Sequence, residues 1–435
     1  MIGHYILAFI VGLMIGFKII PSQVTATLYV VICVVCLIKC IKGDLAGFFT
    51  FLPYAMFVEV FIRGYTRYIP YLTLQYLFIA CFAIMLVRGG RSKRSHSHAF
   101  YFLIIYTFLE IANNVYPDKP IIGKAIITNS FALLLPAIWA SFNVLKPLLI
   151  NKLLDNIKVA TVMLAGIVFV AHITGKINYG LFSNSDASNG MAPVQLSAYL
   201  GLGCILFFLS VMNPEEIKRR YLHMGILSFV ATVMVLTFSR GGIYFLGAVA
   251  ALFVFYNRAK MGNYVRLLLL VPVAIFIYYY VVNQTGGKIV ERYGQEGTSS
   301  RDVLVGIGLT IFLQHPYFGV GTGNYNTTIV KENLYPVESG AHNEYIRAAA
   351  EHGIVGVIFY LGFYILLFFE IQQRRQIQKQ YAMYFLALFC LIIIHNGLKI
   401  SIQPIILMLV IATPSLTYYT RKNVENKEFA ATSIA

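Results

Sequence analysis

The feature that most constrains this chain is a succession of long apolar segments separated by short polar ones. Hydrophobic residues make up 58% of its 435 residues, and charged residues only 12%. A soluble domain of this length could not bury so much apolar surface in one core. A bilayer accepts such segments when each backbone group is hydrogen-bonded within its own helix. The sequence therefore predicts an all-α, polytopic membrane protein.

The apolar segments predict about 12–14 transmembrane helices, since a spanning helix needs roughly 20 mainly apolar residues. The first segment runs directly into a second, so we expect the N-terminus to be a retained anchor rather than a cleaved signal. The candidate spans lie near residues 2–20, 24–41, 48–62, 71–87, 99–116, 122–143, 158–174, 191–211, 222–238, 241–257, 266–283, 354–371, 382–398 and 403–418.

The formal charge of +16 is concentrated in short basic runs between the apolar segments. Such runs are typical of cytoplasmic loops. No RNA-binding or DNA-binding motif accompanies them, so no nucleic-acid partner is expected. When these runs are placed in the cytoplasm, an even number of predicted spans lies between each pair, and both termini also lie in the cytoplasm. The runs are residues 88–98, 215–220, 257–266, 372–379 and 420–427.

The six cysteines all fall inside apolar segments, which argues against a disulfide framework. Cys33, Cys36 and Cys40 would share one helix face, as metal ligands could, but no histidine or acidic partner lies nearby. We therefore interpret them as small packing residues. The sequence predicts no metal and no cofactor. The other three cysteines are Cys81, Cys204 and Cys390.

The longest polar piece, residues 284–353, is expected outside the cytoplasm, and a loop this long is usually functional. Residues 299–314 begin with two serines, carry an acid in the first turn and have an apolar face, which predicts an amphipathic helix on the membrane. A glycine-rich turn follows at 315–326. The stretch "AHNEYIRAAAEHG" predicts a second helix, ended by Gly353 before the next span.

The outward-facing segments are unusually basic for the extracytoplasmic side of a membrane. Arginine binds phosphate through two parallel hydrogen bonds and keeps its charge. Arginines that face a histidine at the membrane surface favour a site for a lipid-linked phosphate or pyrophosphate. The alternative for each arginine is an interfacial anchor to lipid headgroups. The basic residues are Arg240, Lys288, Arg292, Arg301, Arg347, His315, His342 and His352.

His342 is the candidate base of this group, because histidine titrates near neutrality and can take a proton from a sugar hydroxyl. The alternative is a helix N-terminal residue satisfied by backbone groups. Asn343 and Arg347 share a face of the predicted helix, and Arg347 can pair with Glu344 or Glu351 at helical spacing. Those pairs would form a clasp that orients His342.

Three charged residues fall in or near predicted spans. A charge at mid-bilayer costs roughly 2.5–3.5 kcal/mol on insertion scales, so such residues are often functional. Lys18 and Glu59 lie near span ends, where they can reach the interface. Glu110 is the functional candidate among them, with no role that the sequence assigns.

Three segments together resemble the C-terminal signature of the bacterial O-antigen ligase and O-antigen polymerase superfamily. They are "TFSRGGIYFLGAVAALF" (237–253), "SSRDVLVGIGLTIFLQHPYFGVGTGNYN" (299–326) and "AHNEYIRAAAEHGIVGVIFYLGFYILL" (341–367). Their order and spacing match, and they cover about the last 200 residues of the chain. The resemblance divides the chain into N-terminal spans at 1–221, the signature region at 222–420 and a cytoplasmic tail at 421–435.

The resemblance implies an inner-membrane glycosyltransferase of the GT-C type, inverting and independent of metal. Such enzymes take a glycan from an undecaprenyl-pyrophosphate carrier on the periplasmic face. The family pattern matches Arg240, Arg301 and His342, which we expect to be catalytic. We expect Arg240, Arg301, Arg292, Arg347 and Asn343 to bind substrate.

Polymerases and ligases of this superfamily differ in the acceptor. A polymerase joins the glycan to another carrier-linked repeat unit, with a chain-length regulator as a possible partner. A ligase joins it to lipid A-core. The Ile-, Lys-, Phe- and Tyr-rich composition favours the polymerase. A lipid-linked glycan transporter is the distant alternative. Transporters usually place ionisable residues and broken helices at mid-membrane, often in repeated halves, whereas here the polar groups gather in one outward loop and no repeat is evident. A scaffold would not need the arginine–histidine cluster.

Overall fold

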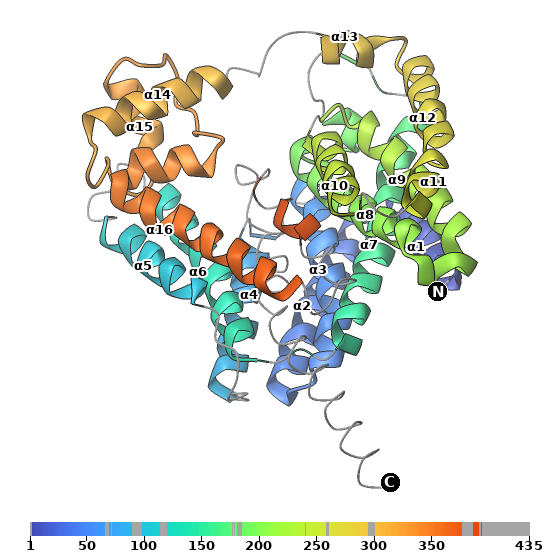
Figure 1. Cartoon of the computed structure of the whole chain (residues 1–435), viewed down its shortest axis with the longest axis horizontal. Coiled ribbons are helices and arrows are strands. Elements are labelled where there is room, and N and C mark those ends of the chain that lie inside the picture. Colours follow the sequence, from blue (N-terminus) through green and yellow to red (C-terminus); the bar gives the residue numbers. More distant parts are fainter. Residues whose placement is uncertain are drawn as a thin grey trace, which may run out of the picture. The chain divides into compact units, whose positions relative to one another are not determined.

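The structure is a computed structural model that describes residues 2–65, 69–70, 72–88, 98–113, 120–143, 145, 147–175, 177, 179–180, 185–239, 241–257, 261–294, 301–375, 386–390 and 393. These residues form helices joined by turns and contain no strand, which confirms the all-α prediction (Figure 1). Seven of the described helices are long and apolar enough to cross a membrane, and four shorter ones are apolar. The polytopic prediction is therefore confirmed.

The number of spans stays a prediction, because the segment at 403–418 lies outside the described residues. Of the segment at 382–398, only residues 386–390 and 393 are described. The predicted cytoplasmic tail at 421–435 also lies outside them.

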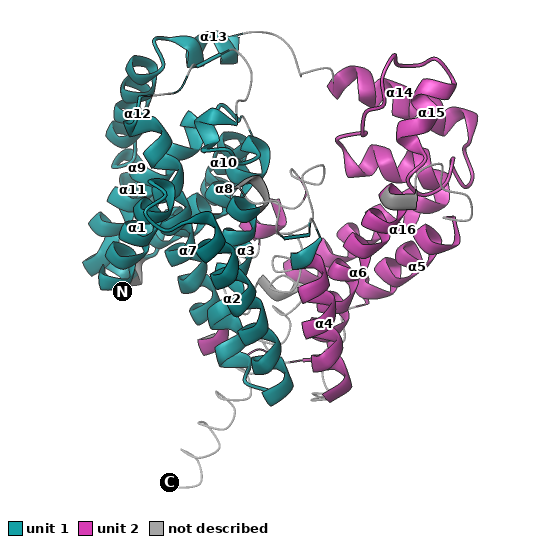
Figure 2. Ribbon diagram, turned by 180° about the vertical axis from the view of Figure 1, so that it is seen from behind, with its two compact units in different colours: residues 1–74, 151–296 teal, residues 75–150, 297–435 magenta. Residues whose placement is uncertain are grey.

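The chain forms two compact units (Figure 2). Unit 1 consists of residues 1–74 and 151–296, and unit 2 of residues 75–150 and 297–435. Each unit thus combines segments from both halves of the sequence. The signature region is divided between the two.

Unit 1 is built around α8, in which every residue from Gln195 to Met212 is buried. The helices α9 and α10 pack against it. At Gly12 in α1 a Cβ atom would lie 2.2 Å from the Met163 carbonyl oxygen, so only glycine allows this close approach to α7. The elements are α1 (Ile2–Gly16), α2 (Ser22–Lys42), α3 (Leu45–Tyr65), α7 (Pro147–Ile173), whose first turn belongs to unit 2, η1 (Asp186–Ser188), α8 (Pro193–Met212), η2 (Pro214–Arg219), α9 (Arg220–Leu236), α10 (Gly241–Asn257), α11 (Met261–Leu268), α12 (Val271–Gln284) and α13 (Lys288–Gly294).

Two of these helices differ from the prediction. α7 begins at Pro147 rather than near residue 158, because its first turns bury leucines such as Leu153 and Leu154 while their polar residues face outward. The span predicted at 266–283 is divided into α11 and α12. Pro272 lies in the first turn of α12, where its missing N–H is tolerated, whereas inside a continuous helix it would break a hydrogen bond.

Unit 2 contains the helices that carry most of the predicted site. α5 packs along α16 and against α6, while α14 and α15 pack on α16. The helix predicted at 299–314 is confirmed as α14, whereas its position on the membrane stays a prediction, and α15 was not predicted. The elements are α4 (Thr73–Arg88), which begins at the unit boundary, α5 (Ala99–Ala112), α6 (Pro120–Phe142), α14 (Arg301–Gln314), α15 (Tyr325–Lys331) and α16 (Glu344–Arg375).

Candidate functional site

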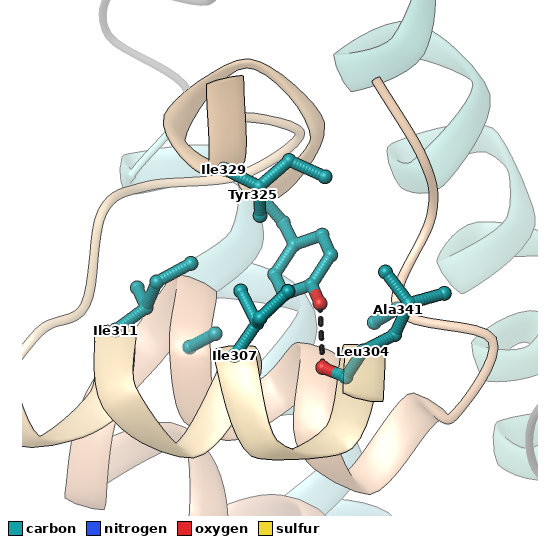
Figure 3. Packing of buried hydrophobic residues seen from close by; sticks show 7 residues of the cluster. Leu304, Ile307, Ile311, Tyr325, Ile329 and Ala341 are labelled. Carbon is teal, nitrogen blue, oxygen red and sulfur yellow. Dashed lines mark hydrogen bonds between the residues drawn. The ribbon is translucent and has the colours of Figure 1, made fainter. Parts of the chain in front are cut away.

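α14 is held by a buried cluster of side chains that it shares with α15 and the start of α16 (Figure 3). Leu304, Ile307 and Ile311 recur every three or four residues, so they line one face of the helix. Tyr325 of α15 packs on this face, and its hydroxyl donates a hydrogen bond to the Leu304 carbonyl at 2.8 Å. Burial, and the nearby Glu351 carboxylate, raise the pKa of Tyr325 to about 12, so this phenol is protonated at neutral pH.

The glycine-rich turn after α14 contacts α16 through its backbone. The Gly321 N–H donates to the Glu351 carbonyl at 2.9 Å. A Cβ atom at Gly319, where φ is +66°, would lie 2.2 Å from the carbonyl carbon of Glu351. These glycines therefore serve the close approach of two backbones, which any larger residue would prevent.

α16 is broken at Gly353, where φ is 61° and ψ is −154°. This conformation is open essentially only to glycine. Because of the break, the Ile354 N–H does not continue the helical hydrogen bonds. It donates instead to the Pro316 carbonyl of the glycine-rich turn at 2.8 Å. The prediction that Gly353 ends the first helix is confirmed in this sense, although the element continues to Arg375.

His342 lies two residues before α16, with φ of 48° and an exposed side chain. This left-handed conformation is uncommon for residues other than glycine. Asn343 caps the helix, because its Oδ1 accepts hydrogen bonds from the backbone N–H groups of Tyr345 at 2.9 Å and Ile346 at 3.3 Å. Asn343 thus has a structural role, and its predicted contact with substrate stays a prediction.

Arg301 is the first residue of α14 and is exposed. It makes no ion pair or side-chain hydrogen bond with any described residue. A cation at a helix N-terminus is unfavourable for the helix dipole, so Arg301 does not stabilise α14. Leu304, one turn further on, and Ala341, directly before His342, lie side by side in the buried cluster (Figure 3). Arg301 and His342 therefore each lie within one helical turn, along the chain, of a residue of the same buried cluster.

Arg347 donates to three carboxylates. Its Nε lies 2.7 Å from Glu344, its Nη1 2.8 Å from Glu351 and its Nη2 2.9 Å from Glu110. The pairing with Glu344 and Glu351, predicted from helical spacing, is confirmed. Each nitrogen of this guanidinium is occupied by the protein itself. The geometry therefore favours the clasp over the substrate-binding role predicted for Arg347.

Glu110 joins three elements of unit 2 and is fully buried. One carboxylate oxygen accepts from Arg347, and the other accepts from the Ser130 hydroxyl on α6. The Glu110 backbone carbonyl accepts from the Thr322 hydroxyl of the glycine-rich turn at 2.6 Å. The sequence singled out Glu110 as a charge without a role. It gave no signal for Ser130 or Thr322, whose partners are distant in the chain.

The other two histidines of the loop differ from each other. His352, which the sequence places in an outward-facing segment, is fully buried. Its Nδ1 lies 3.3 Å from the side-chain nitrogen of Asn113, and its ring packs edge-on against Tyr106, because this turn of α16 faces α5. His315 is 46% exposed, and its Nε2 lies 3.7 Å from the Glu332 carboxylate.

Two predicted arginines belong to the sequence range of unit 1. Arg240 lies outside the described residues, although the turn around it is tied to α8. The Ser197 hydroxyl accepts from the Gly242 N–H at 3.0 Å and donates to the Ser239 carbonyl at 3.4 Å. Arg292, in α13, is only 9% exposed. The remaining predicted site residues all lie in unit 2.

A comparison with known protein families identifies the region that contains most of these residues. Residues 224–361 match the Wzy_C family model, which is described as O-antigen ligase. Over these residues the chain is similar to the O-antigen ligase family, which supports the O-antigen ligase and polymerase superfamily. The resemblance predicted from the three motifs is thereby confirmed. The matched region includes Arg301 and His342 but not Glu110. No curated protein sequence matches the chain.

The described part of the chain offers no group of three or more histidine, cysteine, aspartate or glutamate side chains that could hold a metal ion. The six cysteines form no disulfide bond with one another. Metal independence stays a prediction of the family resemblance. What the site offers is an exposed guanidinium and an exposed imidazole on a rigid support, with a buried cluster of charges behind them.

Proposed function

We propose that this protein is an inner-membrane glycosyltransferase that takes a glycan from an undecaprenyl-pyrophosphate carrier on the periplasmic face. As a repeat-unit polymerase, it joins that glycan to another carrier-linked unit. One observation carries the proposal. Arg301 and His342 are both exposed, both lie in the region of the O-antigen ligase family match, and both are positioned by one buried cluster.

Glycosyl transfer from a pyrophosphate carrier requires a cation at the leaving group and a proton acceptor at the incoming hydroxyl. In this mechanism Arg301 and Arg240 hold the pyrophosphate and stabilise the negative charge that grows on it as the anomeric carbon–oxygen bond breaks. His342, neutral at the start, accepts the proton of the acceptor hydroxyl as that oxygen bonds to the anomeric carbon from the opposite face. The configuration is inverted. Arg292 and Asn343 are further predicted contacts to the substrate.

Ligase activity is the second candidate, because the matching family model carries that description. The donor chemistry is the same, and lipid A-core replaces the carrier-linked unit as acceptor.

A lipopolysaccharide gel from a strain that lacks this gene separates the two activities. Core that bears a single repeat unit and no ladder supports the polymerase. Bare core, with full-length polymer retained on the lipid carrier, supports the ligase instead. An unchanged ladder would refute both.

Complementation of the same strain tests the residues. We expect Arg301→Ala and His342→Ala to restore less than about 1% of the wild-type ladder, since removal of one such stabilising group costs roughly 10²–10³ in rate. His315→Ala is the matched control, because His315 is an exposed histidine of the same loop outside the proposed site. Equal membrane levels are checked by immunoblot. Near-normal transfer by His342→Ala would overturn its assignment.

A further inference from the structure

We propose that Glu110 is a positioning residue for glycosyl transfer, which holds the first part of α16, and with it His342, through Arg347. This inference rests on the proposed function. It adds a residue that lies outside the region 224–361 matched by the family model.

The three carboxylates around Arg347 are not equivalent. Glu344 and Glu351 lie on the same helix as Arg347, three residues before it and four after it, so their bonds to Arg347 do not attach that arginine to another helix. Glu351 also accepts a hydrogen bond from the Tyr325 N–H of α15 at 3.4 Å. Glu110 lies on α5, and its bond to Arg347 at 2.9 Å is the ion pair of this cluster that connects two helices. Ser130 fixes the second oxygen of Glu110, which leaves the carboxylate little freedom to turn.

The first part of α16 needs such an attachment because the helix is broken. At Gly353 the backbone leaves the helical region, so the apolar span that follows does not by itself fix residues 344–352. The backbone of the glycine-rich turn holds one end of this segment, at Glu351. Glu110 holds this segment near its other end through Arg347, which lies about one turn from His342.

A short path connects the attachment to His342. The Arg347 N–H donates to the Asn343 carbonyl at 2.9 Å, which closes the first turn of α16. Asn343 caps that turn and directly follows His342. A displacement of Arg347 therefore moves the cap and the histidine together.

A stabilising role alone does not account for these charges. Buried ion pairs are often no more stabilising than well-packed apolar side chains of similar size. Glu110 is fully buried in an otherwise apolar helix, where a carboxylate is costly and commonly functional. Fixed geometry at His342 is what the ion pair provides and an apolar contact would not.

The test is Glu110→Gln in the full-length protein, reconstituted in proteoliposomes with an undecaprenyl-pyrophosphate-linked repeat unit. Small misplacements of a catalytic group cost roughly 100-fold in rate. We therefore expect kcat to fall about 10- to 100-fold while KM for the donor changes less than about twofold. Glu332→Gln is the matched control, because Glu332 lies in the same unit, near exposed His315, and should leave both constants unchanged.

The deciding measurement combines Glu110→Gln with His342→Ala. If Glu110 acts through His342, the double variant has the same residual rate as His342→Ala alone. A further fall of 10-fold or more would show a separate, structural effect and overturn the inference. If His342→Ala alone retains near-normal transfer, the proposed function of His342 fails, which is a different outcome.

Arg347→Lys supports the same test if Glu110→Gln does not accumulate in the membrane. Lysine keeps the charge but cannot bond three carboxylates in one plane. We expect Arg347→Lys to lower kcat as much as Glu110→Gln does. In the His342→Ala background it should cause no further loss. An additive loss would refute the inference in this variant too.

Discussion

Gly353→Ala should be among the most destabilising single-methyl changes in this protein. Its φ of 61° and ψ of −154° belong to a region that other residues occupy at a cost of about 1–3 kcal/mol. The added Cβ would also lie 2.4 Å from the carbonyl carbon of Tyr317, a backbone atom that cannot turn away. Overpacking of this kind adds about 1–3 kcal/mol. Together these two costs predict that Gly353→Ala lowers the free energy of unfolding by roughly 2–6 kcal/mol.

Thermal unfolding of the detergent-solubilised protein measures this loss, and Gly306→Ala is the matched control. Gly306 lies on the exposed side of α14, and a Cβ atom there would meet nothing within 4 Å. Alanine is the better helix former by about 0.5–1 kcal/mol, so this variant should be slightly more stable than wild type. Gly353→Ala should lower Tm by about 2–7 °C, because the entropy of unfolding of a chain of 435 residues is roughly 0.9 kcal/mol/K. A Tm within one degree of wild type would refute the close packing of the turn on α16.

Two further predictions concern buried polar groups. Arg347→Ala should lower the free energy of unfolding by about 3–5 kcal/mol, measured by thermal unfolding, because it leaves buried carboxylates without a counter-charge. Adding Glu110→Gln to this variant should recover part of that stability. A further loss of stability in the double variant would contradict the prediction. Tyr325→Phe should cost about 1 kcal/mol at pH 7 through the bond to Leu304. Its pKa is raised from 10.0 to about 12, so the folded state keeps a proton that the unfolded state releases. Wild-type stability relative to Tyr325→Phe should therefore fall between pH 10 and 12, and a constant difference would refute the shift.

The spans and the main loop elements could be predicted because local sequence determines them. A bilayer forces each spanning segment to satisfy its own backbone, so hydropathy and length locate the helices. The start of α14 and the break at Gly353 follow from capping residues and from a glycine between two helical patterns. The pairs that Arg347 makes with Glu344 and Glu351 also follow from spacing along one helix.

The rest could not be predicted because it depends on contacts between distant segments. Glu110 and Arg347 are separated by 237 positions, and nothing in either segment identifies the other as its partner. The burial of His352 has the same origin, since it depends on which turn of α16 faces α5. The short helix α15 was missed because seven residues carry too little periodic signal.

The predicted site residues differ in whether their hydrogen-bond donor groups are already bonded within the protein. Arg301 and Arg347 are both arginines near the N-terminus of a helix in the same loop, and the sequence treats them alike. Arg347 gives all its nitrogens to carboxylates of its own unit, so a phosphate could bind it only by displacing a buried ion pair. Arg301 is exposed and makes no such pair with the described residues. An anionic donor should therefore meet Arg301, while Arg347 and Glu110 hold the support on which His342 acts.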